Sequence, residues 1–181
     1  MCLVFFFTAG TMTALAQRSG SYEKDIFWAH LGMGYHSFNS GQPGLGLGVH
    51  YSWGRNLLSL QGSGNLEVEI FCPQGLPQLE QYSAMYGQRI AFSGAFFYYK
   101  AGPSLVVHRY AVHKVAPADG TGCPHYIYNK NFRPGINGEF GLAQTFNWFS
   151  IQVFVSGLLA QPEPSFQAGV RLAFGTFGST D

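Results

Sequence analysis

The segment that most constrains the fold is residues 166–174, FQAGVRLAF, near the end of the chain. Its side chains alternate strictly between two faces, as in a β-strand, where successive residues point to opposite sides. One face consists of Phe166, Ala168, Val170, Leu172 and Phe174. The other face carries Gln167, Gly169, Arg171 and Ala173. A strand with one wholly apolar face must turn that face either to a protein core or to lipid.

The composition favours lipid. Charged residues make up 10% of the 181-residue chain, whereas soluble domains contain about 25%. Aromatic residues make up 17% and there are 24 glycines. After the N-terminal segment, no apolar run approaches the roughly 20 residues that a membrane-spanning helix needs. A formal net charge of +1 gives no electrostatic basis for binding nucleic acid. These features together predict a β-barrel in lipid.

Similar alternation in seven further segments gives eight expected strands. They are residues 26–38, 45–54, 58–70, 82–90, 97–107, 136–142, 149–155 and 166–174. Short turns are expected at residues 55–56, 93–94 and 144–147, and longer loops at residues 72–79 and 110–133. Membrane barrels have an even number of strands, short periplasmic turns and longer outer loops. We therefore predict an all-β, antiparallel, up-and-down transmembrane β-barrel of about eight strands, with its N-terminus on the periplasmic side.

Two details of these strands carry further expectations. Pro103 lies inside the fifth strand and indicates a bulge or an interruption of the pairing there. The aromatic residues expected to form interfacial girdles, on the apolar face near strand ends or next to one, are Tyr35, Tyr51, Trp53 and Trp148.

Nearly every strand charge falls on the polar face. The members of this expected lumen network are Glu67, Glu69, Arg89, Lys100, Glu139 and Arg171. The outer face of a soluble barrel would carry many more Lys and Glu residues, whereas this face is mainly Gly, Ser, Asn and Gln. Side chains just fill the interior of an eight-stranded barrel, and buried charges must be paired to be tolerated. Three glutamates facing three cations predict an interior whose charges balance. Because the interior is expected to be filled, a diffusion pore is not favoured.

The chain is expected to consist of a signal peptide, residues 1–16, and a barrel domain, residues 17–181. Residues 3–7 form a short apolar block, and an Ala-Leu-Ala cleavage site ends at Ala16. Export would place Cys72 and Cys123, both in turn-rich segments on the outer side, in an oxidising compartment where they can pair. Two unpaired loop thiols are the alternative.

The Ala-Gln cleavage point, the eight alternating segments and the GVRLAF sequence resemble the small outer-membrane β-barrel proteins of Gram-negative bacteria. The resemblance is one of pattern and covers residues 17–174. It implies localisation in the outer membrane, with outer-membrane lipid and the barrel-assembly machinery as partners. It also implies that Phe174 is the aromatic residue which that machinery reads in the closing strand.

The function expected from these observations is non-enzymatic. The protein would have a structural or surface-interaction role and contact an extracellular partner through residues 72–79 and 110–133. An alternative is a lipid-modifying enzyme, because His50 and Ser52 resemble the His-x-Ser pair of outer-membrane lipid-A deacylases. Both residues share the expected lumen face, however, which favours a hydrogen-bonded interior network. Another alternative is a soluble periplasmic barrel with reversed faces, which would bind a small apolar ligand beside Tyr99, Phe140 and Val153.

Metal chemistry is considered because several potential ligands share the polar face. These residues are His30, His36, His50, Glu67 and Glu69. Ligands must also converge at one height, which the sequence pattern does not indicate. We therefore assign no metal ligand, no catalytic residue and no cofactor.

Overall fold

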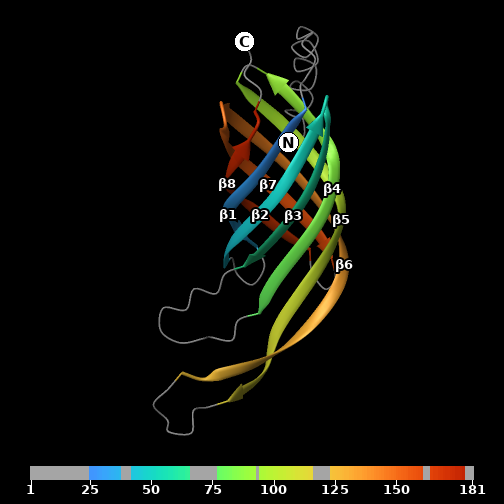
Figure 1. Cartoon of the computed structure of the whole chain (residues 1–181). Helices are drawn as coiled ribbons and strands as arrows, with labels where there is room; N and C mark the ends of the chain where they lie inside the picture. Colours follow the sequence, from blue (N-terminus) through green and yellow to red (C-terminus); the bar gives the residue numbers. More distant parts are fainter. Residues whose placement is uncertain are drawn as a thin grey trace, which may run out of the picture.

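The structure is a computed structural model, and it describes residues 25–37, 42–65, 77–92, 94–115, 123–160 and 164–177. These residues form β1 (Ile26–His36), β2 (Gln42–Trp53), β3 (Asn56–Asn65), β4 (Gln78–Phe92), β5 (Ala95–Val115), β6 (His125–Phe146), β7 (Phe149–Ala160) and β8 (Ser165–Gly175). Each strand pairs antiparallel with the next, and β1 also pairs with β8, so the sheet closes into a barrel (Figure 1). The predicted eight-stranded, up-and-down barrel is confirmed.

The two faces of the strands are divided largely as their alternation predicts. On β8, Phe166, Leu172 and Phe174 are exposed, whereas Gln167 and Arg171 are buried inside the barrel. The soluble-barrel alternative requires Tyr99, Phe140 and Val153 to point inward. Their exposed fractions are 37%, 60% and 50%, so the reversed arrangement is wrong. Val107 keeps its expected outward position, opposite Glu80 and Phe132 in the register, but it is only 5% exposed.

Tight turns join the strands at one end of the barrel, which we call the turn end. Gly54 and Gly94 have φ values of +54° and +68° in the first two turns, a conformation that glycine adopts without steric cost. The third turn is at Asn147 and Trp148, because β6 continues to Phe146. It therefore lies slightly later than expected.

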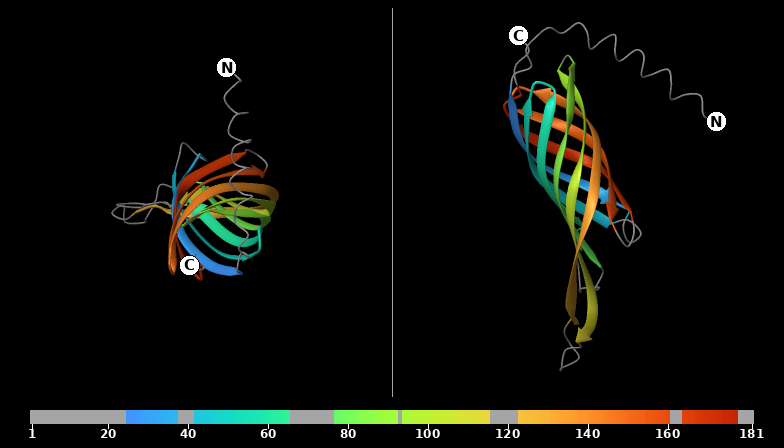
Figure 2. Two further views of the ribbon diagram at one scale, coloured as in Figure 1. Left: turned by 90° about the horizontal axis from the view of Figure 1, so that it is seen from above. Right: turned by 90° about the vertical axis from the view of Figure 1, so that its right-hand side faces the viewer.

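The predicted long loop at residues 110–133 is wrong for most of its length. β5 continues to Val115 and β6 begins at His125, and the two strands pair as far as Val115 and His125. Beyond their pairing with β4 and β7, residues 110–115 and 125–134 form a two-stranded projection, which we call the ribbon (Figure 2). The period of two is lost here because a bulge at Val112 shifts the register. Solvent also reaches both faces, so neither face needs to be apolar.

The interruption predicted at Pro103 is confirmed. Pairing between β4 and β5 stops at Ser83–Ser104 and resumes at Tyr86–Ala101, whereas Pro103 remains opposite Ile136 of β6. The proline has no N–H group to donate to β4.

The described residues contain no apolar helix of the length that a membrane crossing requires.

Candidate functional site: the lumen and the outer face

Glu139 of β6 is the centre of the polar lumen. Its carboxylate is fully buried and accepts hydrogen bonds from Nη1 and Nη2 of Arg171 at 2.5 and 2.8 Å. The Lys100 ammonium lies 3.1 Å from Oε1, and Gln61 donates to Oε2 at 3.1 Å. The bidentate geometry with arginine is the strong form of this interaction. One carboxylate therefore holds together side chains from β3, β5, β6 and β8.

A chain of hydrogen bonds extends from this centre toward β1. Lys100 Nζ donates to Ser59 Oγ at 3.1 Å, and Ser59 Oγ lies 2.5 Å from Nδ1 of His50. His50 Nε2 lies 2.6 Å from Nδ1 of His30. The Trp28 ring is stacked on the His50 ring, with centroids 4.8 Å apart. The two imidazoles are thus structural members of the interior network.

Each lumen cation also lies against an aromatic ring. The Arg171 guanidinium is 3.5 Å from the centroid of Phe154, Lys100 is 5.3 Å from that of Tyr98, and Arg89 is 5.7 Å from that of Phe96. A ring face attracts a cation, and more strongly where water is excluded. These aromatic partners were not predicted from the sequence. The available signal was the occurrence of large rings on the otherwise small, polar face.

Apolar clusters lie toward both ends of the polar lumen. The cluster near the turn end consists of Ile26, Trp28, Leu57, Phe96, Tyr98, Ala143, Ala173 and Phe177. The cluster at the opposite end consists of Leu79, Val106 and Leu158, with Ala160 packed against it. The polar network of the lumen thus lies between two apolar layers.

The residues predicted for the lumen network are only partly described. Arg89, Lys100, Glu139 and Arg171 are buried inside the barrel, and the last three are in direct contact. Arg89 lies nearer the turn end, where it donates to Ser52 Oγ at 3.0 Å. Glu67, Glu69 and Cys72 lie outside the described residues. Glu139 is the one acidic side chain inside the barrel among the described residues, so the expected balance of three glutamates and three cations stays a prediction, as does the Cys72–Cys123 disulfide.

The arrangement does not form the His-x-Ser pair considered above. His50 is bonded to Ser59 and His30, whereas the Ser52 hydroxyl accepts from Arg89. Both residues are buried in the lumen, with exposed fractions of 2% and 0%, on the inner side of the barrel wall. Among the described residues, no group of three or more His, Cys, Asp or Glu side chains could hold a metal ion.

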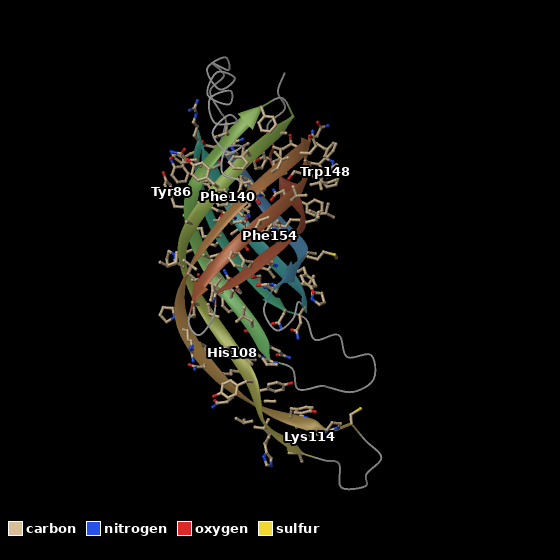
Figure 3. All side chains as sticks on the ribbon, turned by 180° about the vertical axis from the view of Figure 1, so that it is seen from behind. Tyr86, His108, Lys114, Phe140, Trp148 and Phe154 are labelled. Carbon is tan, nitrogen blue, oxygen red and sulfur yellow. The ribbon has the colours of Figure 1, made fainter. Side chains whose placement is uncertain are left out.

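The outer face of the barrel is an apolar belt with aromatic residues near the turn end. Tyr51 and Trp53 are stacked with ring centroids 5.6 Å apart, and Trp148 is stacked on Phe174 at 5.7 Å. The Tyr51 and Tyr86 hydroxyls donate to Asp25 and Asn56. In Figure 3, Tyr86 and Trp148 lie near this end of the barrel, whereas the lumen residue Phe154 lies nearer the middle. Aromatic rings with a polar tip are typical of the membrane interface.

The ribbon and its base carry an excess of positive charge. Arg109 forms an ion pair with Glu80, whereas Lys114, Lys130 and Arg133 have no acidic partner among the described residues. Burial lowers the pKa of His108 at the base of the ribbon, and Arg133 lowers it further. His108 is therefore neutral at pH 7 and the excess comes from lysine and arginine. Figure 3 shows Lys114 far from the barrel body and His108 closer to it.

Comparison with known proteins shows likeness at the level of the fold. Neisserial surface protein A has a TM-score of 0.59 with 10% identity, covering 83% of this chain and 96% of that protein. The N-terminal β-barrel domain of Pseudomonas aeruginosa OprF has a TM-score of 0.54 with 17% identity, covering 84% and 98%. A de novo designed transmembrane β-barrel has a TM-score of 0.50 with 13% identity, covering 83% and 95%.

The sequence itself matches no protein-family model and no curated protein. At 10–17% identity, the structural likeness concerns the fold. It agrees with the closed ring of strands, the apolar outer face and the polar interior. The chain therefore has the fold of the small eight-stranded outer-membrane β-barrel proteins that its sequence pattern resembles.

Proposed function

We propose that this protein is a non-enzymatic outer-membrane barrel that presents its ribbon to a partner at the outer surface. The observation that carries the proposal is the combination of a packed lumen with a projecting, cationic ribbon. Clusters at both ends and the Glu139 network fill the interior, which argues against a pore. The His50 and Ser52 contacts argue against a catalytic pair. The ribbon is the remaining large exposed feature of the described chain.

The apolar outer face supports insertion in a membrane. Side chains that would destabilise a soluble protein are exposed on every strand, including Met33 at 67%, Leu47 at 65% and Leu159 at 65%. Closure of the sheet leaves no unpaired barrel edge in the hydrocarbon, where each unsatisfied backbone group would cost several kcal/mol. Short turns at one end and the ribbon at the other support an orientation with the ribbon outside.

The barrel-assembly machinery is the partner proposed for insertion. Phe174 lies on the outer face of the closing strand β8, near the turn end, and is 47% exposed. It stacks on Trp148 of the neighbouring turn. Its accessible position near the periplasmic end supports recognition of this strand during assembly.

Amine labelling of intact cells tests whether the ribbon is presented at the outer surface, and with it the orientation of the barrel. A membrane-impermeant reagent should label Lys114 and Lys130 on the ribbon but not the fully buried Lys100. The variant Arg55→Lys supplies a matched control, because it places an amine in a tight turn at the opposite end. That amine should be labelled only after permeabilisation. Labelling of Arg55→Lys in intact cells, with Lys114 and Lys130 protected, would invert the proposed orientation.

Single-channel recording tests the packed lumen. Purified barrel in a planar bilayer should conduct no ions in steady openings, because the two apolar clusters and the Glu139 network fill the interior. Steady, voltage-independent conductance from the wild-type barrel would assign a pore function instead. Neither experiment requires the outside partner to be known.

A further inference from the structure

The outer face across β2 to β6 is ordered in cross-strand rows. One row consists of Leu47, Gly62, Tyr82, Leu105 and Pro134, each opposite the next in the sheet. The following row toward the ribbon consists of Leu45, Gly64, Glu80, Val107 and Phe132. One row further along, Arg109 lies opposite Lys130. Side chains in these rows point to one face, because residues directly opposite or two apart share a face of the sheet.

The first of these rows lies in a hollow of about 700 Å³ on the outer face of the barrel. Leu47, Leu60, Tyr82, Ala84 and Leu105 are among its lining residues. The hollow exists because β3 has no outward side chain beyond Leu60, where Gly62 and Gly64 take the next two outward positions. A Cβ atom at Gly62 would meet the Tyr82 ring at 3.4 Å and the Gln81 carbonyl oxygen at 3.8 Å, both ordinary van der Waals contacts. This shape suits an acyl chain lying along the barrel.

The polar end of the same face is cationic. On β5 and β6, the first outward charges beyond the apolar rows are Arg109 and Lys130. Four residues separate Arg109 from Leu105, about 13 Å at the rise of a strand. The hollow therefore lies within one lipid length of the two cations. Lys114, opposite Tyr126, continues the same face of the ribbon.

The two cations lie directly opposite each other in the ladder. Like charges in this position destabilise a strand pair. Glu80 compensates Arg109, and Lys130 has no acidic partner among the described residues. A phosphate group at this position would neutralise Lys130. It would also bind the Arg109 guanidinium, which it would share with Glu80, since arginine and lysine both bind phosphate.

We propose that this face binds a phosphorylated acyl lipid of the outer leaflet, with an acyl chain in the hollow and a phosphate group between Arg109 and Lys130. The lipid is favoured over a soluble anion because the cations and the hollow belong to one continuous face. The proposal rests on the outer-membrane orientation proposed above.

The test uses two variants, each with a matched control. Lys130→Gln removes a cation from the proposed site, and Arg133→Gln removes one from the opposite face of the ribbon. Gly62→Leu fills the hollow, and Gly138→Leu adds the same side chain at an outward glycine of β6, where an added Cβ atom would meet no other atom within 4 Å. Lipid binding to each refolded barrel is measured by native mass spectrometry. The probes are diphosphoryl lipid A, its dephosphorylated form and inorganic phosphate as competitor.

Wild-type protein should retain diphosphoryl lipid A and bind the dephosphorylated form much more weakly. Lys130→Gln and Gly62→Leu should each weaken retention about tenfold, the loss expected for one strong polar contact or a filled apolar site. The two control variants should behave as wild type. Equal retention of both lipids, or equal losses in Lys130→Gln and Arg133→Gln, would overturn the phosphate site. Displacement by inorganic phosphate, or wild-type retention by Gly62→Leu, would overturn the lipid as occupant.

Gel mobility of the same samples, boiled and unboiled, separates this proposal from the proposed function. A heat-shifted wild-type band without lipid retention would overturn the lipid site alone. A wild-type band without a heat shift would count against the membrane barrel and therefore against both proposals.

Discussion

Replacing Glu139 with glutamine should strongly destabilise the barrel. The glutamine side chain would keep the size of the glutamate but lose the charge that Lys100 and Arg171 share. One of its two polar atoms would also be an N–H donor, which cannot accept from the guanidinium. Leaving a buried charge without its partner costs about 3–5 kcal/mol. Because two cations lose the same partner, we expect the upper end of that range.

The measurement is equilibrium unfolding by urea in lipid vesicles, followed by tryptophan fluorescence. Glu80→Gln is the matched control, since it makes the same chemical change in the partly exposed ion pair with Arg109. A solvent-exposed ion pair contributes about 0–1 kcal/mol. Adding Lys100→Met to Glu139→Gln should recover part of the loss, because it removes one of the two uncompensated cations.

Unfolding of Glu139→Gln at the same urea concentration as Glu80→Gln would contradict a dry lumen in which Glu139 is the sole partner of the two cations. That result would mean that water or another anion compensates Lys100 and Arg171 inside the barrel. The lumen would then be hydrated, and a hydrated lumen would be compatible with a pore.

Three further predictions concern the outer face, the packing of the lumen and the cysteines. Val153→Arg should cost about 2–4 kcal/mol in vesicle unfolding if the side chain faces the middle of the bilayer; a neutral effect would place it outside the hydrocarbon. Gly141→Ala should cost about 1–3 kcal/mol, because a Cβ atom there would overlap the buried Tyr98 ring, whereas Gly138→Ala has open space and should be nearly neutral. Reductant should slow the unboiled band on a gel if Cys72 and Cys123 pair, a loop closure worth about 4 kcal/mol; Cys123→Ser should abolish that change, and a reductant effect persisting in the variant would exclude the bridge.

The alternation of side chains predicted most of this fold because the barrel separates two very different environments. On β1, for example, Leu31 and Met33 are exposed on the apolar outer face, while His30 is buried and bonded to His50 inside. Each residue on such a strand therefore carries information about its face. The strand number and the closing strand follow from this signal, whereas the interruption at Pro103 follows from the missing N–H group of proline.

The ribbon and the lumen contacts were not predictable in the same way. Residues such as Val112 and Ile127 are exposed on a ribbon with solvent on both faces, so no period of two is required of them. Inside the barrel, the pairing of Glu139 with Lys100 and Arg171 depends on the heights at which three strands bring their side chains. Register fixes those heights, and a single sequence does not encode register in its polarity pattern.

The ribbon also has consequences for how neighbouring molecules meet in a crowded membrane. Beyond the barrel, residues 110–115 and 125–134 have no strand beside their outer edges among the described residues, and an open edge invites another strand to add. Three features oppose such growth: Pro134 lacks an N–H group, Lys130 repels its own copy, and the bulge at Val112 twists the edge. These ribbons should therefore remain separate on a densely packed surface rather than joining into a continuous sheet between barrels.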